Sequence, residues 1–192
     1  MYGLKTENQQ LKTDKAKAEL YALKEQISPH FFFNTLNNLY GLINKDADKS
    51  REYVLKLSDL MRYAIYSGEH EFVFLKEELS YLENFIALHE IRYHNKVSID
   101  FQKDIQNDQI QIAPLLLIIL LENAFKHGAE TLTKDVFIDL TLRADEASIY
   151  FAVKNNFDPT ITVSKPGVGL DNLRTRLELM YPMRHQLNIL QE

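Results

Sequence analysis

Residues 26–34 read Gln26-Ile27-Ser28-Pro29-His30-Phe31-Phe32-Phe33-Asn34, which places a histidine directly after a proline in a run that otherwise favours helix. At 100° per residue, the amides Gln26 and Asn34 lie within about 40° of His30 on the helical wheel. The apolar side chains gather roughly 180–300° from His30. They are Phe32, Phe33, Leu36, Leu39, Tyr40 and Ile43. The pattern therefore predicts that His30 lies on a polar stripe, away from the buried face.

Pro29 decides how the chain enters this helix. It lacks the N–H that would donate to the carbonyl of Glu25, so it either kinks a continuous helix or starts a new one with Ser28 as N-cap. A kink would leave neighbouring backbone open to a second domain. A lone exposed histidine is often an ordinary surface residue; here the adjacent proline and the flanking amides favour a functional role.

The bulk composition narrows the class of protein. The chain has 192 residues, of which 45% are hydrophobic and 26% charged, as is typical of globular proteins. Its net charge of −5 argues against a nucleic-acid partner or an anionic membrane surface. It has no cysteine, which excludes disulfides and thiolate chemistry. The longest apolar run, 112–121, is short of the ~20 residues of a membrane span, and no signal peptide is visible. We expect a cytoplasmic location.

The N-terminal third is expected to form a helical hairpin. Residues 1–25 carry a thin apolar stripe in a polar helix that continues towards His30, and a polar turn follows at Asp46 and Asp48. The next helix has apolar residues at helical spacing. They are Tyr53, Val54, Leu57, Leu60, Met61, Ala64 and Ile65. Because two such hairpins make a four-helix bundle, we predict dimerisation through residues 1–66.

The rest of the chain alternates between helical and strand-like patterns. Residues 72–75 read as a short apolar linker, and Asn107 and Asp108 offer N-caps to a long helix. The expected order is helix 77–93, strand 97–101, helix 112–127, strands 136–142 and 149–153, loop 155–169, helix 170–180 and a strand at 186–190. This order predicts an α+β sandwich with helices on one face of a mixed sheet, apparently truncated at its C-terminus. We place the domains at 1–70 and 71–192.

A group of polar side chains ends the most apolar helix, in Leu120-Leu121-Glu122-Asn123-Ala124-Phe125-Lys126-His127-Gly128. Asn123 and His127 are four residues apart, as are Glu122 and Lys126, so the two pairs share one side of an α-helix. A salt-bridged terminus capped by Gly128 would explain them structurally. An amide oxygen is also a hard ligand suited to Mg²⁺, and a lysine one turn on can meet a phosphate.

A glycine-containing segment, Lys165-Pro166-Gly167-Val168-Gly169-Leu170, runs straight into the last predicted helix. Glycines permit close backbone approach, and a helix N-terminus attracts anions. Arg174 and Arg176 would add positive charge. One Gly-x-Gly is weak evidence alone; its value comes from following the Glu122–Gly128 group in the order expected of one nucleotide pocket.

With these residues assembled, the chain from about Ala22 resembles the LytS/YehU-like sensor histidine kinases, which carry a GHKL (Bergerat) type ATPase domain. The histidine box is similar over 26–34 and is highly specific. The N box is similar over Leu121–Gly128, and the G2 box over Gly167–Leu177. Linking motifs lie at Leu57–Tyr63, Leu75–Glu78 and Arg92-Tyr93.

The resemblance implies autophosphorylation of His30 from Mg-ATP and transfer to an aspartate of a response regulator of the LytTR type. It also implies a homodimer and a parent protein anchored in a membrane upstream of Met1. His30 would attack as neutral imidazole. The roles it implies are Mg²⁺ at Asn123, phosphates at Lys126, base contact at His127, polar assistance at Glu122, and nucleotide contacts at Asn155, Gly167, Gly169 and Arg174.

The chain also departs from the family pattern. The G1 box often reads Asp-x-Gly-x-Gly, whereas the matching stretch is Val153-Lys154-Asn155-Asn156-Phe157; Asn155 can accept from an adenine amino group only through an amide oxygen. Ile119 stands where related ATPases often have a polar residue, and Phe31 leaves the general base open. A second hypothesis is therefore a non-catalytic dimeric signalling module whose GHKL-like domain binds nucleotide or partners.

Overall fold

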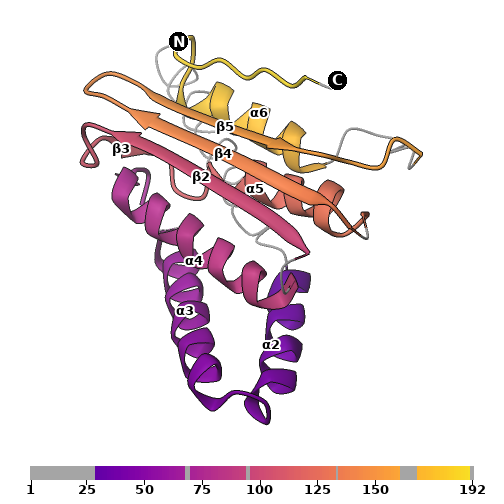
Figure 1. The fold of residues 1–192 in the computed structure, drawn as a ribbon. Coiled ribbons are helices and arrows are strands. Elements are labelled where there is room, and N and C mark those ends of the chain that lie inside the picture. The colour runs from indigo at the N-terminus through magenta and orange to yellow at the C-terminus, as the bar shows by residue number, and fades with distance from the viewer. Residues whose placement is uncertain (1–28, 68–69, 94–95, 133, 161–167, 191–192) are drawn as a thin grey trace, which may run out of the picture.

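The computed structural model describes residues 29–67, 70–93, 96–132, 134–160 and 168–190. Two helices, α2 (Pro29–Ile43) and α3 (Ala47–Tyr66), come first. They are followed by β1 (Val73–Phe74), α4 (Leu75–Tyr93), β2 (Val97–Ile105), β3 (Gln111–Ile112), α5 (Ile118–Ala124), the π-helical turn η2 (Phe125–Ala129), β4 (Val136–Ala144), β5 (Ile149–Asn155) and α6 (Val168–Met180) (Figure 1). The predicted α+β class is confirmed. The helix predicted over residues 1–25, and the choice at Pro29 between a kink and a new start, depend on residues outside the described ranges.

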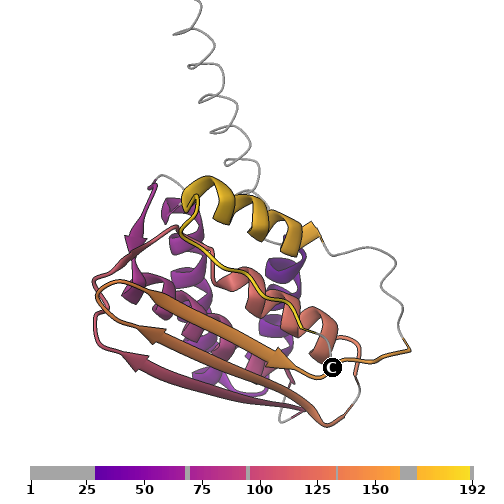
Figure 2. The ribbon, with the colours of Figure 1, turned by 90° about the horizontal axis from the view of Figure 1, so that it is seen from above.

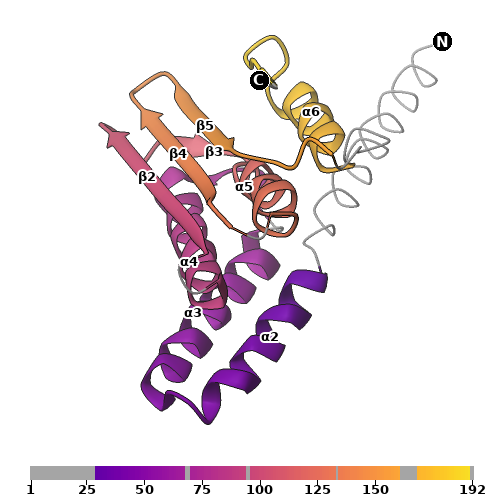
Figure 3. The ribbon, with the colours of Figure 1, turned by 45° about the vertical axis from the view of Figure 1, so that its right-hand side comes forward.

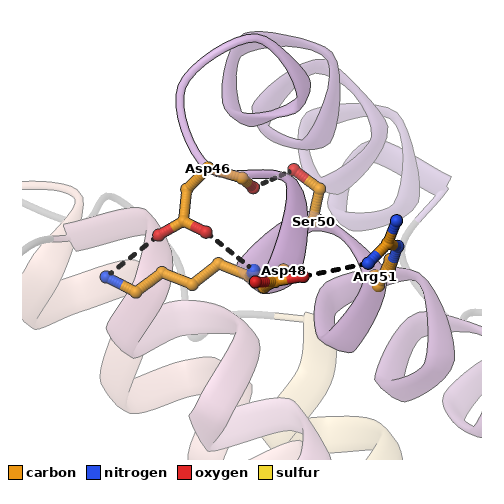
Figure 4. A network of polar contacts seen from close by, with 5 residues as sticks. Asp46, Asp48, Ser50 and Arg51 are labelled. Atoms are coloured by element: carbon orange, nitrogen blue, oxygen red, sulfur yellow. Dashed lines mark hydrogen bonds and ion pairs between the residues drawn. The ribbon is translucent and has the colours of Figure 1, made fainter.

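The helical hairpin turns at Asp46, which is the N-cap of α3. The Asp46 carboxylate accepts a hydrogen bond from the backbone N–H of Lys49 at 3.0 Å, and its carbonyl accepts from the Ser50 hydroxyl at 2.7 Å (Figure 4). The first bond satisfies a backbone N–H that a helix start leaves without an intrahelical partner. The polar turn predicted at Asp46 is therefore the corner from which α3 runs back towards α4 (Figure 1).

The face that α2 buries differs from the predicted one. Phe31 and Thr35 are 8% and 3% exposed, whereas Phe33 and Tyr40 are 69% and 78% exposed. The predicted inner face is thus wrong for the single chain, because α3 and α4 pack on the side that carries Phe31. The outer apolar stripe of α2 is left uncovered. The side chain of His30 lies outside the described part of the structure, so its predicted exposure stays a prediction.

The main sheet has the strand order β2-β4-β5, with β2 parallel to β4 and β4 antiparallel to β5. Alternate residues of β4, from Val136 to Ala144, are buried, and those between them face outwards. Helices α4, α5 and α6 lie on one side of this sheet (Figures 2 and 3). The prediction of a mixed sheet with helices on one face is confirmed.

One hydrophobic cluster extends from Phe31 in the hairpin to Leu173 in α6. The helical hairpin therefore packs directly on the sheet-bearing part through α4. The division at residues 70 and 71 stays a prediction. Within the described ranges, no helix is both long enough and apolar enough to cross a membrane.

The helix predicted from Ile112 begins later, at Ile118. Ile112 instead pairs with Val73, so that β3 and β1 form a small antiparallel sheet where a linker was expected. The intervening turn contains Leu115 with φ 56°, and its backbone groups are held by two buried side chains described below. Asn107 caps no helix; its carboxamide oxygen accepts from the N–H of Gln109 within a turn.

The strand predicted at residues 186–190 is wrong. These residues belong to no ladder among the described strands, and β5 pairs with β4 alone. Alternation of apolar side chains favours an extended backbone, but a strand also needs a partner for its N–H and C=O groups. Leu187 packs against the hydrophobic cluster, whereas Ile189 and Leu190 are exposed.

Candidate functional site

Phe31 packs the start of α2, which carries residues 29–34 of the histidine box, against α4. The Phe31 ring stacks on Phe85 of α4, with centroids 4.6 Å apart and planes at 26°, and lies 5.3 Å from the His89 ring. Phe31 immediately follows His30 in the chain, so this contact fixes the backbone at the predicted phospho-acceptor position against α4.

His89 continues the same stack towards the second half of the protein. Its ring lies 3.9 Å from that of Phe125 at 19°, and Tyr93 stacks 5.7 Å away at 8°. His89 is 4% exposed, and neither ring nitrogen has a hydrogen-bond partner among the described residues. Burial, aided by the charge of Arg92, lowers the pKa of His89 to about 3, so the ring is neutral at physiological pH.

The stack therefore joins the histidine box to the N box. Phe31 belongs to the first motif and Phe125 to the second, and His89 lies between them. The sequence predicts the helix 77–93 that carries His89, but it does not predict this role. Helical spacing shows which face is buried, but it does not show which distant rings will meet there.

The N box spans the junction of α5 and η2. Glu122 and Asn123 are half-buried on α5, while Lys126 on η2 is exposed. At this junction the N–H of Glu130 donates to the carbonyl of Phe125 at 3.0 Å, a π-type spacing that is rare and often found at functional sites. The helix predicted over 112–127 therefore changes from α-helical to π-helical spacing within the N box.

Two N-box groups have shifted pKa values. Burial raises the pKa of Glu122 to about 7, so this carboxyl can hold or release a proton near neutrality. Burial and the neighbouring charge of Lys126 lower the pKa of His127, against a smaller opposite effect of Glu130. His127 is therefore neutral at physiological pH. Within the described ranges, no cluster of three or more acidic or histidine side chains could hold a metal by itself.

The end of the N box lies against the end of β5. A Cβ at Gly128 would come within 3.1 Å of the carbonyl oxygen of Asn156 and 3.5 Å of Nδ2 of Asn155. Asn155 donates through that nitrogen to the carbonyl of Asn156 at 2.8 Å. Asn156 in turn accepts from the N–H of Phe137 at 3.0 Å, which ties the end of β5 to β4. The structure thus brings Asn155 next to the N box, as expected.

The start of α6 lies over α5. A Cβ at Gly169 would be 3.8 Å from the side chain of Ile119, so the two helices approach closely there (Figure 2). Gly167 falls outside the described residues. Arg174 is exposed and forms a long ion pair with Asp171 of its own helix at 3.4 Å.

The expectation that Arg176 adds charge to an anion site is wrong. Arg176 is 2% exposed and donates to the carbonyls of Leu115 and Pro114 at 2.9 Å and 2.5 Å. Sequence analysis also missed its counterpart, the buried carboxylate of Glu78. Glu78 stands in the linking motif Leu75–Glu78, and that motif was the sequence signal that could have identified it.

Comparisons with known proteins found similar sequences and a similar solved structure. Residues 18–97 match the histidine kinase family. The chain is 30% identical over 184 residues to the sensor protein LytS of Staphylococcus haemolyticus (strain JCSC1435), covering 89% of this chain and 32% of that protein. It is 30% identical over 188 residues to the sensor protein LytS of Bacillus subtilis (strain 168), covering 91% and 32%.

A solved structure, the catalytic domain of histidine kinase ThkA, aligns with a TM-score of 0.39 at 18% identity over 56% of this chain and 79% of that one. The chain spans about a third of the length of the curated relatives that it matches. The chain is therefore similar to the LytS sensor proteins over about nine tenths of its own length, and residues 18–97 match the histidine kinase family.

Proposed function

We propose that this chain is the acceptor and ATP-binding core of a sensor histidine kinase in a two-component system. It transfers the terminal phosphoryl group of Mg-ATP to His30 and then to an aspartate of a response regulator. The observation that carries the proposal is the ring stack of Phe31, His89 and Phe125, because it seats the start of the acceptor helix against the N box.

The side chains around the N box fit a magnesium nucleotide. Asn123 offers a hard amide oxygen, and Mg²⁺ typically takes few protein ligands and keeps several waters. Lys126 is exposed and positively charged, as a phosphate contact requires. When bound, ATP supplies the transferable phosphoryl group.

Other groups of the chain position the nucleotide and handle protons. His127, neutral because its pKa is lowered, flanks the base, and the Asn155 amide oxygen accepts from the adenine amino group. Glu122 has a pKa of about 7, so it stays partly protonated beside the phosphates and repels them less than an ordinary carboxylate. Gly167 and Gly169 let the α6 start approach the phosphates, and Arg174 adds surface charge there.

His30 is the nucleophile in this scheme. A neutral imidazole nitrogen attacks without prior removal of a proton, and the ordinary pKa near 6.5 leaves it mostly neutral at physiological pH. Most of the rate enhancement then comes from positioning and from charge neutralisation, as in phosphoryl transfer generally.

We also propose that the functional unit is a homodimer. Phe33, Leu36, Tyr40 and Ile43 form a stripe along α2, and each is at least 49% exposed in the single chain. Val54, Met61 and Ile65 extend it along α3, with exposures of 43–63%. An uncovered apolar surface on a helical hairpin suits pairing into a four-helix bundle.

The relatives are sensor proteins, and the chain spans about a third of them. We therefore propose that it is the cytoplasmic part of a receptor whose parent is anchored in a membrane. Its phosphoryl acceptor would be a response regulator of the LytTR type.

A non-catalytic signalling module is the second candidate. It is favoured by the end of β5, where Asn155 replaces the acidic residue of a typical G1 box and its side-chain nitrogen is already bonded to Asn156. Such a module would bind nucleotide or a partner without phosphoryl transfer.

Incubation with γ-labelled ATP and Mg²⁺ separates the two candidates. The kinase proposal expects acid-labile label in the wild type and in His70→Gln, a control at an exposed histidine outside the site, and none in His30→Gln. Nucleotide binding without label in any of the proteins would favour the signalling module. Equal label in wild type and His30→Gln would contradict the assignment of His30.

A further inference from the structure

A strained turn lies directly before the N-box helix. Residues 113–117 connect β3 to α5, and Leu115 has φ 56° although it is not a glycine. Left-handed backbone is unfavourable for a branched side chain and persists only where surrounding contacts fix it. Leu115 is 3% exposed, and its side chain packs in the hydrophobic cluster.

Glu78 of α4 holds this turn from one side. One carboxylate oxygen accepts from the N–H of Leu115 at 2.5 Å, and the other accepts from the N–H groups of Leu116 and Leu117 at 3.2 Å and 3.4 Å. These are backbone donors that a helix start leaves unsatisfied, and a negative charge is favourable there. Glu78 is 1% exposed, so its carboxylate is bonded to protein groups and not to solvent.

Arg176 of α6 holds the turn from the other side. Its guanidinium donates to the carbonyl of Leu115 at 2.9 Å and to that of Pro114 at 2.5 Å. The backbone of Leu115 is therefore bonded through its N–H to α4 and through its C=O to α6. Two buried charged side chains together fix a conformation that the residue itself disfavours.

Tyr63 brings the acceptor hairpin into the same network. Its hydroxyl donates to the Glu78 oxygen that also accepts from Leu115, at 2.6 Å. Its ring packs against Tyr81 of α4, with centroids 5.1 Å apart. One carboxylate oxygen thus has a donor from α3 and a donor from the turn that starts the N-box helix.

We propose that Glu78 is a positioning residue that couples the orientation of the acceptor hairpin, sensed through the Tyr63 hydroxyl, to the backbone at the start of the N-box helix. This inference rests on the proposed kinase function for its activity readout. A shift of α3 that draws Tyr63 away changes how the carboxylate holds the strained turn, and Arg176 extends the effect to α6. Coupling of this kind acts equally in both directions.

Tyr63→Phe tests the coupling, because it removes a single hydroxyl and keeps the ring. The matched control is Tyr53→Phe, which removes the hydroxyl of another buried tyrosine of α3, one with no contact to the turn at 113–117 among the described hydrogen bonds. Both variants lose one tyrosine hydroxyl of α3 and keep the ring. Only Tyr63→Phe breaks a link to the turn at 113–117.

Two measurements are made on the full chain. The first is the rate of His30 labelling as a function of ATP concentration; we expect Tyr63→Phe to lower kcat about tenfold and to leave KM within about twofold. The second is amide hydrogen exchange at residues 115–117; we expect it to rise about tenfold in Tyr63→Phe and to stay at the wild-type rate in Tyr53→Phe.

The two readouts separate failure of the inference from failure of the proposed function. If the wild type takes no label, the kinase proposal fails, and exchange alone decides the coupling. Unchanged exchange at residues 115–117 in Tyr63→Phe overturns the inference. So does an equal fall of kcat in both variants, since general loss of stability would then explain the effect.

Discussion

At the scale of single residues, His89 shows how a polar side chain can serve as a packing element. Both of its nitrogens are buried without partners in the described part of the chain, yet its ring makes the 3.9 Å contact that joins α4 to η2. Buried, unpaired polar atoms normally cost stability. The ring contacts of His89 with Phe31 and Phe125 are made in spite of that cost.

The buried His89 makes stability depend on acid. Its folded pKa of about 3 lies below the ordinary 6.5, so below pH 6.5 the unfolded chain binds a proton that the folded chain excludes. Folding stability should fall by about 1.4 kcal/mol per pH unit from about pH 6.5 towards pH 3. His89→Phe keeps the ring and removes this dependence.

Urea denaturation at pH 7.5 and pH 5 measures the effect. We expect the wild type to lose about 2 kcal/mol more than His89→Phe between the two values. Glu122 has the opposite pH dependence. Its pKa is raised to about 7 in the folded protein, so the free energy of unfolding falls as the pH rises from about 4.5 to 7. That contribution is common to both proteins and cancels in the difference. Equal pH dependence in both proteins would contradict the neutral, buried assignment of His89.

Gly128 of the N box lies against the residues at the end of β5. A Cβ there would lie 3.1 Å from the carbonyl oxygen of Asn156, whereas nothing lies within 4 Å of a Cβ at Gly41 on α2. We expect Gly128→Ala to destabilise the protein by about 1–2 kcal/mol through overpacking against backbone. Gly41→Ala should instead stabilise it by about 0.5–1 kcal/mol, because alanine favours helix. Thermal unfolding that ranks the two variants in the reverse order would contradict the geometry.

Sequence reasoning reached the N-box residues and Asn155 but not the roles of Glu78 and Arg176. The first set was found because their side chains are polar at the end of an apolar helix, which is a local pattern. Glu78 bonds backbone groups 37–39 residues away, and Arg176 reaches 61–62 residues. The linking motif singles out Glu78 as a residue of interest, but the local sequence of neither residue indicates which distant backbone groups it binds.

At the scale of elements, the strands of the hairpin β4–β5 were predictable and the start of α5 was not. Alternation from Val136 to Ala144 directly reflects one buried and one open face of the sheet. At residues 112–117, apolar spacing also fits a helix, but the pairing of Ile112 with Val73 and the bonds to Glu78 and Arg176 override it. Tertiary contacts decided that boundary.

The N-cap of α3 gives a prediction for an element end. Asp46→Ala removes the bond to the N–H of Lys49 and should cost about 1 kcal/mol. Asp48→Ala is the matched control, since Asp48 is 91% exposed and its ion pair with Arg51 should contribute less than about 0.5 kcal/mol (Figure 4). Chemical denaturation of both variants measures the difference. Equal losses would show that the Asp46 cap adds nothing beyond a surface charge.

At the scale of the whole molecule, the acceptor hairpin and the sheet-bearing part share one hydrophobic cluster. Two motifs that lie far apart in the sequence, the histidine box and the N box, are joined by ring contacts to His89 of α4. Figure 3 shows α4 beside both α2 and α5. A kinase needs its acceptor and its nucleotide groups to come within reach of each other. The shared core links the backbone of the two motifs through α4.

The uncovered stripe on α2 and α3 predicts the assembly state. Tyr40→Lys places a charge in the middle of the stripe, where Tyr40 is 78% exposed, and should convert a dimer into a monomer. Tyr150→Lys is the control, because Tyr150 is 55% exposed but lies on β5. Sedimentation equilibrium measures the mass of each variant. A wild type that is monomeric at high concentration, or a Tyr40→Lys variant that stays dimeric, would contradict pairing through this stripe.

The central claim is that the nucleotide held by the N box donates its phosphoryl group to His30. Mapping by tandem mass spectrometry, at mildly alkaline pH after incubation with Mg-ATP, tests it most directly. We expect a phosphoramidate on the peptide that contains His30, and its loss in Asn123→Ala. Bound nucleotide with His30 unmodified, or phosphate found only on another residue, would contradict the claim.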